Sequence, residues 1–199
     1  MILLSDYVSF IPPAMSSLTP WMIPSQLPSI ISDVIKSLSN EYLISEGTAV
    51  HHTATIEPGA ILKPPYIIGP HCFIASYAYL RGGVWLESDV IIGPACEIKS
   101  SLILRESKAA HFNFIGDAII GRRVNIEAGA VIANYRNELV NKEIVCFSDQ
   151  EKMTTGVDKF GAIVGDGCKI GANSVLAPGT ILKPETVVGR LTLIDDHKQ

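Results

Sequence analysis

From residue 50 onward, an apolar residue recurs at every sixth position, and this period restricts the possible folds more than any other feature of the chain. The first block consists of Val50, Ile56, Leu62, Ile68, Ile74, Leu80, Leu86, Ile92 and Ile98; the spacing returns at Phe114, Ile120, Ile126 and Ile132, and again at Val164, Ile170, Leu176, Leu182 and Val188. Four positions after most of these residues comes a smaller side chain, with glycine and proline between the two. The repeat predicts a short strand and a tight corner in every six residues.

Three such repeats would close one triangular coil, and neighbouring coils would pair their strands in parallel. The expected fold is therefore all-β, a parallel β-helix. The pattern resembles the hexapeptide-repeat proteins, and this resemblance implies a left-handed coil. Cys72, Cys96 and Cys168 occupy small-residue positions of the repeat, so we expect them to fill the core and to have no thiol chemistry.

Residues 1–49 have a different composition and are expected to form a separate Pro-rich segment with a capping helix, before a β-helix over residues 50–199. Five prolines from Pro12 to Pro28 are expected to break any regular element before Ser29. Apolar residues then fall at helical spacing between Leu27 and Leu43. We expect this amphipathic helix, together with Trp21, to cover an open end of the solenoid. A membrane-surface helix is the alternative, but the polar face carries a single lysine, Lys36.

The formal net charge of −4 and the absence of a long basic run argue against a nucleic-acid surface. No apolar run approaches the roughly 20 residues that a membrane span requires. The N-terminus has no basic region that would indicate a signal peptide. Four cysteines without a C-x-x-C pair are typical of a reducing compartment, so we expect a cytoplasmic protein.

Two interruptions of the period are expected to be loops that leave the scaffold. The first lies between Ile98 and Phe114 and contains His111. The second contains an insertion at residues 136–158, in which residues 142–147 and 152–157 are expected to form a protruding hairpin. Since its residues include Ile144, Phe147 and Met153, we expect it to pack across a subunit boundary and to help form a wall of a substrate pocket; a simple brace of the subunit interface is the alternative.

Five motifs make the resemblance to a known family more specific than the hexads do: Glu-Ile-Lys at 97–99, Ser-Lys-x-x-His at 107–111, Gly-Asp at 116–117, Val-Asn-Ile at 124–126 and Asn-Tyr at 134–135. In this order they resemble the acetyltransferase half of the bifunctional enzymes that make UDP-N-acetylglucosamine. The resemblance implies transfer of acetyl from acetyl-CoA to the amine of glucosamine-1-phosphate, in a homotrimer, with no metal required. The uridylyltransferase half has no counterpart in this sequence.

The resemblance also implies roles for individual residues. His111 matches the catalytic base, and histidine titrates near the pH at which it must accept the amine proton. Arg81, Lys99 and Lys159 match the cations that bind the sugar phosphate. Asn125 and Tyr135 match sugar contacts, and Asn134 matches a residue that contacts acetyl-CoA.

Three positions depart from the family pattern. Phe114 replaces a phosphate-binding tyrosine, Arg136 follows Asn-Tyr where the family has aspartate, and Ala172 replaces a serine that contacts the cofactor. The acceptor could therefore differ from glucosamine-1-phosphate. The alternative function is a non-catalytic scaffold that binds a sugar phosphate or a protein. A zinc hydratase of the same fold is disfavoured because the sequence lacks the required spacing of histidines.

Overall fold

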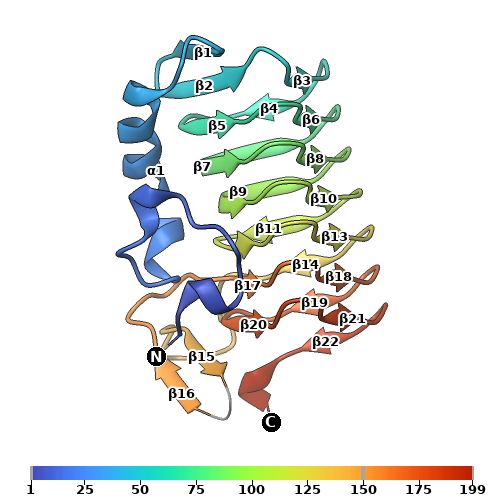
Figure 1. Cartoon of the computed structure of the whole chain (residues 1–199). Helices are drawn as coiled ribbons and strands as arrows, with labels where there is room; N and C mark the ends of the chain where they lie inside the picture. The colour runs from blue at the N-terminus through green and yellow to red at the C-terminus, as the bar shows by residue number, and fades with distance from the viewer. Residues whose placement is uncertain (1, 149–150, 199) are drawn as a thin grey trace.

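The computed structural model describes residues 2–148 and 151–198, which form a parallel β-solenoid with one α-helix along its side (Figure 1). Each coil has three sides, which we call faces one, two and three. Face one contains β2 (Thr48–His51), β5 (Tyr66–Ile68), β12 (Ile119–Ile120), β17 (Ala162–Val164) and β20 (Thr180–Leu182). Face two contains β3 (Thr55–Ile56), β6 (Phe73–Ile74), β8 (Ile91–Ile92), β10 (Lys108–Ala109), β13 (Asn125–Ile126), β18 (Lys169–Ile170) and β21 (Val187–Val188). Face three contains β4 (Ile61–Leu62), β11 (Phe114–Gly116), β14 (Val131–Ile132), β19 (Val175–Leu176) and β22 (Leu193–Ile194).

Two longer strands, β7 (Tyr79–Leu86) and β9 (Glu97–Ile103), start on face three and turn through a corner onto face one. The pair has an irregularity between Arg81 and Val84. Gly82 and Gly83, which lie at this bend, both have positive φ. The bend therefore forms one wall of the corner between faces three and one, where several candidate site residues lie.

The predicted repeat is confirmed as the interior of the solenoid. Ile68, Leu86 and Ile103 are paired in successive coils of face one and are at most 2% exposed. Cys72, Cys96 and Cys168 are buried in the same cluster, as expected. Among residues 2–148 and 151–198, thirteen non-glycine residues have positive φ, and most of them occupy the corner position three after the inward-facing aliphatic residue. The six-residue repeat thus places one left-handed backbone position at nearly every corner.

The expected loop between Ile98 and Phe114 is wrong. In two successive coils, one repeat has five residues in place of six. Leu86, Ile103 and Ile120 therefore pair at intervals of 17 residues in place of 18, and the solenoid continues without a loop. Ile115, which pairs with Ile98 and Ile132, is the inward-facing residue of this side. Phe114 instead points outward, beside Glu97 on the neighbouring strand. His111 therefore lies on an ordinary corner and not in a loop that leaves the scaffold.

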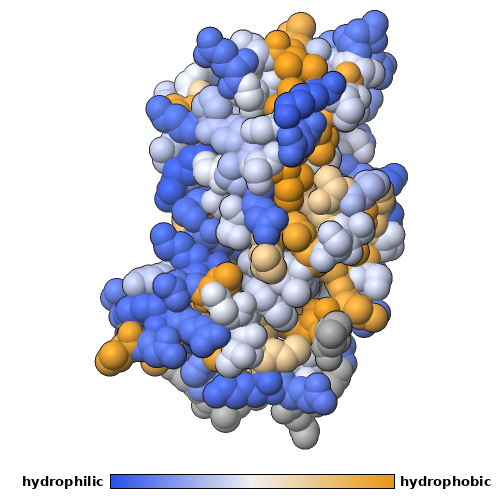
Figure 2. Space-filling model, turned by 90° about the vertical axis from the view of Figure 1, so that its left-hand side faces the viewer, coloured by the Kyte–Doolittle hydropathy of each residue, from blue (hydrophilic) through white to orange (hydrophobic). Residues whose placement is uncertain are grey.

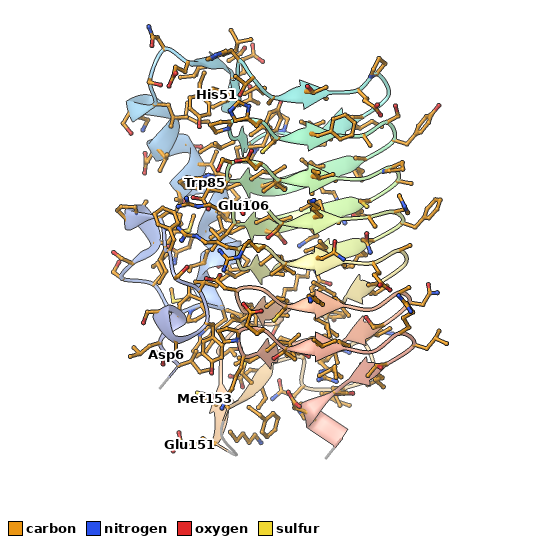
Figure 3. All side chains as sticks on the ribbon, turned by 45° about the vertical axis from the view of Figure 1, so that its right-hand side comes forward. Asp6, His51, Trp85, Glu106, Glu151 and Met153 are labelled. Carbon is orange, nitrogen blue, oxygen red and sulfur yellow. The ribbon has the colours of Figure 1, made fainter. Side chains whose placement is uncertain are left out.

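The helix α1 (Met22–Val34) lies along face one and does not cover an end of the solenoid. It contacts β5, β7 and β9, and a 3₁₀ turn (Ile35–Ser37) ends it. In Figure 3, Trp85 lies on the side of the solenoid that faces this helix. Its side chain packs against an apolar cluster that includes the buried residues Ile23 and Leu27 of the helix. Strand β1 (Tyr42–Ser45), antiparallel to β2, occupies the edge of the sheet at the first coil instead. The end-capping role expected of the helix is therefore not what the structure shows.

The helix also begins earlier than predicted, because two prolines fit inside it. Pro24 is in the first turn, where backbone N–H groups have no partner within the helix. Pro28 is in the interior, where it removes one hydrogen bond, but it packs closely on the solenoid. A Cβ at Gly83 would lie 3.0 Å from the Cδ of Pro28. Burial of Ile23, Leu27 and Ile31 compensates for the local cost of the proline.

Residues 2–38 cover face one as a second layer with its own apolar cluster. This layer includes two short 3₁₀ turns, Leu4–Asp6 and Pro13–Met15. Its side chains pack on outward-facing Ile67, Leu102, Ile119 and Ile163 of the solenoid. Asp166 anchors it, because its carboxylate accepts hydrogen bonds from the Ser9 backbone N–H at 2.9 Å and from Ser9 Oγ at 2.6 Å. The outer surface on this side is largely hydrophilic, apart from a narrow apolar strip along the molecule (Figure 2).

The expected hairpin is confirmed in β15 (Val145–Ser148) and β16 (Glu151–Thr154), which pair antiparallel. Part of the predicted turn lies outside the described residues. The hairpin rests on its own chain: Ile144 and Cys146 are fully buried in the cluster of the N-terminal layer, and Tyr7 Oη lies 2.9 Å from Ser148 Oγ. This intramolecular packing removes the reason for expecting an adjacent subunit to support the hairpin. None of the described helices is long and apolar enough to cross a bilayer.

Candidate active site

The candidate residues lie at both edges of face three and on face two. Arg81, Lys99 and Asn134 occupy one corner, between faces three and one, which we call the cationic corner. His111 and Ala172 occupy the opposite corner, between faces two and three. Phe114 is on face three between them, and Asn125 is on face two. The chain alone therefore does not bring all the candidates together.

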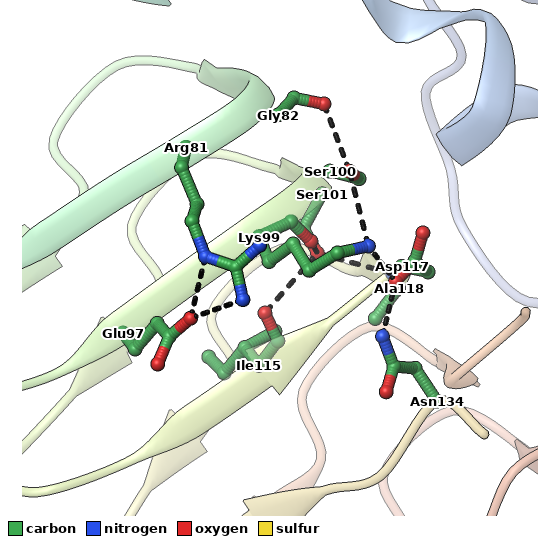
Figure 4. Close-up of polar contacts among 10 residues, drawn as sticks. All are labelled: Arg81, Gly82, Glu97, Lys99, Ser100, Ser101, Ile115, Asp117, Ala118 and Asn134. Carbon is green, nitrogen blue, oxygen red and sulfur yellow. Dashed lines mark hydrogen bonds and ion pairs between the residues drawn. The ribbon is translucent and has the colours of Figure 1, made fainter. Parts of the chain in front are cut away.

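At the cationic corner, Arg81 and Lys99 are direct neighbours across two parallel strands. The guanidinium of Arg81 contacts Glu97, with Nε and one terminal nitrogen each 2.7 Å from the same carboxylate oxygen (Figure 4). The side chains of this pair are 37% and 34% exposed, so the guanidinium still faces solvent. An anion that binds Arg81 must share it with Glu97.

Lys99 is more enclosed than Arg81, since its side chain is only 16% exposed. Its Nζ lies 2.5 Å from Asp117 Oδ2, and the same oxygen accepts a hydrogen bond from the side-chain amide of Asn134 (Figure 4). Ser100 Oγ lies 3.4 Å from the ammonium group. Because an ammonium has three N–H donors, Lys99 keeps donor capacity for a ligand beside its ion pair.

The insertion leaves and re-enters the solenoid at this same corner. Phe160 N donates to the Asn134 carbonyl at 3.1 Å, and Gly161 N donates to the Asp117 carbonyl at 2.8 Å. Lys159, one residue before, is exposed and has no hydrogen bond or ion pair with the described part of the chain. Tyr135 is 39% exposed, with Lys142 Nζ 5.3 Å from its ring centroid. The chain on both sides of the insertion, at Tyr135 and at Lys159, thus adjoins the Asn134 end of the cationic corner.

Phe114 is half-buried on face three, next to the cationic corner. Gly116 allows this close packing, because a Cβ there would lie 2.7 Å from the Phe114 ring and 2.9 Å from the Asn134 side chain. The phenyl ring therefore walls the site but offers no hydroxyl to a phosphate.

His111 is exposed, and its imidazole makes no hydrogen bond or ion pair with residues 2–148 or 151–198. Backbone hydrogen bonds connect its corner to that of Ala172: Gly129 N donates to His111 O at 2.9 Å, and Asn173 N donates to Ala128 O at 3.0 Å. His111 and Ala172 therefore line one edge of face three, parallel to the solenoid axis. An exposed imidazole without a partner is available to exchange a proton with a ligand.

Asn125 points outward on face two, away from the other candidates. It pairs in register with Lys108 on one side and Lys169 on the other. A hollow of about 710 Å³ extends from Asn125 and Lys108 toward Phe73 and His71. Within one chain, Asn125 therefore lies on a different face from the cationic corner.

Arg136, the departure after Asn-Tyr, is a buried structural residue. Its guanidinium donates to the Pro178 carbonyl at 3.0 Å and to Asp195 Oδ1 at 2.8 Å. These contacts attach the first residue of the insertion to the last two coils of the solenoid. Among the described residues, no group of three or more His, Cys, Asp or Glu side chains is arranged to hold a metal ion.

Sequence reasoning gave no role to Glu97 or Asp117, although both belong to the motifs singled out above. Each is the carboxylate partner of a predicted phosphate cation. The register of the strands could have revealed the first of these partners, because residues one coil apart on adjacent strands lie side by side. Glu97 is 18 positions after Tyr79 and pairs with it, and Arg81 is two residues further along the strand of Tyr79.

A family model described as the hexapeptide repeat of succinyl-transferase matches residues 156–189. Curated relatives carry the name bifunctional protein GlmU. The protein from Buchnera aphidicola subsp. Schizaphis graminum is 36% identical over 130 residues, which are 65% of this chain and 24% of the relative. That from Nitrosomonas europaea is 34% identical over 154 residues, covering 76% and 30%. That from Methanococcus vannielii is 29% identical over 180 residues, covering 88% and 43%.

This chain therefore spans less than half the length of the curated relatives that it matches. A solved structure of mutant AntD, an N-acyltransferase from Bacillus cereus in complex with dTDP and coenzyme A, is 17% identical, with a TM-score of 0.44. The match covers 73% of this chain and 72% of that one. The expected resemblance to hexapeptide-repeat acyltransferases is confirmed by the family match and by the similarity to the GlmU proteins.

Proposed function

Because the chain is a hexapeptide-repeat solenoid that resembles the GlmU proteins, we propose that it is an acyltransferase that uses acetyl-CoA and acetylates the amine of an amino-sugar phosphate. The observation that carries the proposal is the layout of face three. One edge presents Arg81 and Lys99, and the other presents the unpartnered imidazole of His111. A phosphate at the first edge would direct the rest of the sugar across the face.

In the proposed reaction, the sugar amine attacks the thioester carbonyl, and the C–S bond breaks as the amide forms. The amine must lose a proton during this attack, because an ammonium has no lone pair. His111 accepts that proton and then returns it to the thiolate of coenzyme A. Lys99 and Arg81 hold the phosphate by charge-assisted hydrogen bonds. Asn134 and Ala172 flank the path of acetyl-CoA, while Tyr135, Lys159 and Phe114 line the acceptor side.

We also propose that the functional unit is a homotrimer, in which face two of one copy lies against face three of the next. The N-terminal layer already covers face one, so faces two and three remain for a partner. The corner between them carries three exposed apolar side chains: Tyr77, Phe112 and Leu191 are 76%, 71% and 80% exposed. Such an arrangement brings Asn125 of one copy toward the cationic corner of another.

The test is incubation of the protein with acetyl-CoA and glucosamine-1-phosphate, with release of the thiol followed by a colour reagent. Free glucosamine and other amino-sugar phosphates serve as alternative acceptors. Acceptor-dependent thiol release that His111→Ala abolishes supports the proposal. If sugar phosphates bind without any thiol release, the chain is the non-catalytic scaffold that the departures at Phe114 and Ala172 leave as the second candidate. Light scattering that shows a monomer at micromolar concentration contradicts the trimer.

A further inference from the structure

Asp117 connects three separate parts of the cationic corner, although it takes no part in the proposed acetyl transfer. Its carboxylate holds Lys99 and Asn134, and its backbone carbonyl holds Gly161 at the end of the insertion. Its own N–H donates to the Lys99 carbonyl at 2.8 Å. The residue is only 5% exposed. Asp117 thus fixes both the backbone and the side chain of Lys99.

The fold itself does not require a carboxylate at this position. Equivalent corner positions of neighbouring coils are occupied by Gly82, Ser100 and Asn134, none of which carries a charge. Burying an ion pair is at best a weak source of stability, because both charges lose water. The charge on Asp117 is therefore better explained by what it does to its partners than by the solenoid.

We propose that Asp117 is a positioning residue that presents the Lys99 ammonium to the phosphate of the acceptor and holds Asn134 beside it; this rests on the proposed function. A lysine side chain has several rotatable bonds, and its ammonium is a point charge without fixed direction. The ion pair at 2.5 Å fixes Nζ on Asp117, while the Lys99 backbone pairs with that of Arg81 on the adjacent strand. A phosphate at this corner then meets an ammonium group whose position is set.

The competing interpretation is that Asp117 simply neutralises Lys99 and must be displaced by the phosphate. The two interpretations predict opposite results. If Asp117 positions Lys99, its removal weakens acceptor binding. If Asp117 competes with the phosphate, its removal strengthens binding, because the ammonium is released.

The experiment compares Asp117→Asn, Lys99→Met and the double variant by their KM for glucosamine-1-phosphate. Positioning predicts that Asp117→Asn raises this KM about tenfold, as expected for a lost charge-assisted contact, with a smaller effect on kcat. In the Lys99→Met background, the same substitution should add no further increase, since the group on which it acts is gone. A fall in KM, or an equal rise in both backgrounds, overturns the proposal.

Asp166 offers a matched control, because it also follows an inward-facing residue, Val164, by two positions and is 9% exposed, but it lies at a different corner, between faces one and two. Its carboxylate holds Ser9 and the Arg122 N–H at 2.8 Å, far from the candidate site. Asp166→Asn should lower the melting temperature but leave the acceptor KM unchanged. If it changes KM as Asp117→Asn does, the effect is general destabilisation and the positioning role is wrong.

A second readout does not need turnover. An amine-acylating reagent followed by mass spectrometry measures how fast each lysine is modified. Lys99 should react more slowly than the exposed Lys36 and Lys152 in the wild-type protein, and it should react faster in Asp117→Asn than in the wild type. If no sugar phosphate is acetylated, the proposed function fails, whereas an unchanged rate at Lys99 shows that Asp117 does not hold it.

Discussion

Replacing Ile67 with alanine tests whether the N-terminal layer is part of the folded core. Ile67 and Ile68 are neighbours on β5 and point to opposite sides of face one, yet they are only 1% and 0% exposed. Ile68 fills the solenoid, while Ile67 packs beneath the N-terminal layer. On an uncovered solenoid the outward residue would face water, and its truncation would cost little.

The expected cost follows from the three carbons that are removed. At about 0.8 kcal/mol for each buried methylene, the lost transfer free energy is about 2.4 kcal/mol. A residual cavity adds to this, and Ile→Ala changes in cores cost about 2–5 kcal/mol. For a chain of this size, each kcal/mol lowers the melting temperature by about 2–4 °C. We therefore expect a decrease of about 6–12 °C for a cost near 3 kcal/mol.

Calorimetry of Ile67→Ala, Ile68→Ala and Ile61→Ala measures this effect. Ile61 has the same outward position of the repeat on β4, but it is 52% exposed. Truncating it should change stability by only about 0.5 kcal/mol. If Ile67→Ala behaves like Ile61→Ala and not like Ile68→Ala, the N-terminal layer contributes no tight packing and the reasoning is wrong.

Three further outcomes are expected. His111→Ala should lower turnover by roughly 10²–10⁴-fold while acetyl-CoA binding, measured by titration calorimetry, stays nearly intact; turnover within a few-fold of wild type removes His111 from the mechanism. Arg81→Ala should weaken the sugar phosphate more than free glucosamine, and equal KM changes for both sugars would place this cation outside the phosphate site. Burial raises the pKa of Cys72 to about 11 and that of Cys146 to about 12, so a thiol reagent at pH 8 should label these cysteines only after denaturation.

The sequence predicted faces two and three better than face one. Its six-residue period identifies the residues that point into the solenoid, because each coil repeats the same inward position. A second signal was present but unused: on face one the outward neighbour is also aliphatic, as in Ile119-Ile120 and Ile163-Val164. A strand that is apolar on both sides is buried on both sides. This pattern predicts a covering layer on that face, and hence the place of α1.

The coils with a five-residue repeat were harder to predict, because the loss of one residue interrupts the six-residue period in the sequence just as an inserted loop does. The spacing from Ile98 to Ile103 and from Ile115 to Ile120 is five, so two corners are shortened and the register is kept. Choosing Phe114 as the inward residue followed from counting backward in sixes from Ile120. Only the pairing of Ile115 with both Ile98 and Ile132 resolves the choice.

The roles of charged residues depend on partners from the neighbouring strand or coil. A sequence motif can therefore identify these residues without showing what their side chains contact. Arg81 and Lys99 could be matched to phosphate-binding cations, but the matches do not reveal that Glu97 and Asp117 already contact them. In our proposal, a phosphate that binds here meets two ion pairs and also Lys159, an exposed lysine with no hydrogen bond or ion pair to the described part of the chain. Affinity should then depend on geometry more than on net charge, because each guanidinium or ammonium must satisfy its carboxylate and the phosphate together.

The same layout explains why a single copy is an incomplete catalyst in our proposal. His111 and the cationic corner lie at opposite edges of face three, and Asn125 lies around the next corner on face two. No movement of side chains within one rigid coil brings Asn125 to Lys99, since the strands between them are hydrogen-bonded to coils on both sides. A second copy that places its face two against this face three closes the gap without any change in the fold. Mixing Asn125→Ala and Lys99→Ala variants, with exchange of subunits, tests this directly. Mixed trimers would contain some sites with both residues intact, so activity above that of either variant alone is expected, and its absence argues that each site is built within one chain.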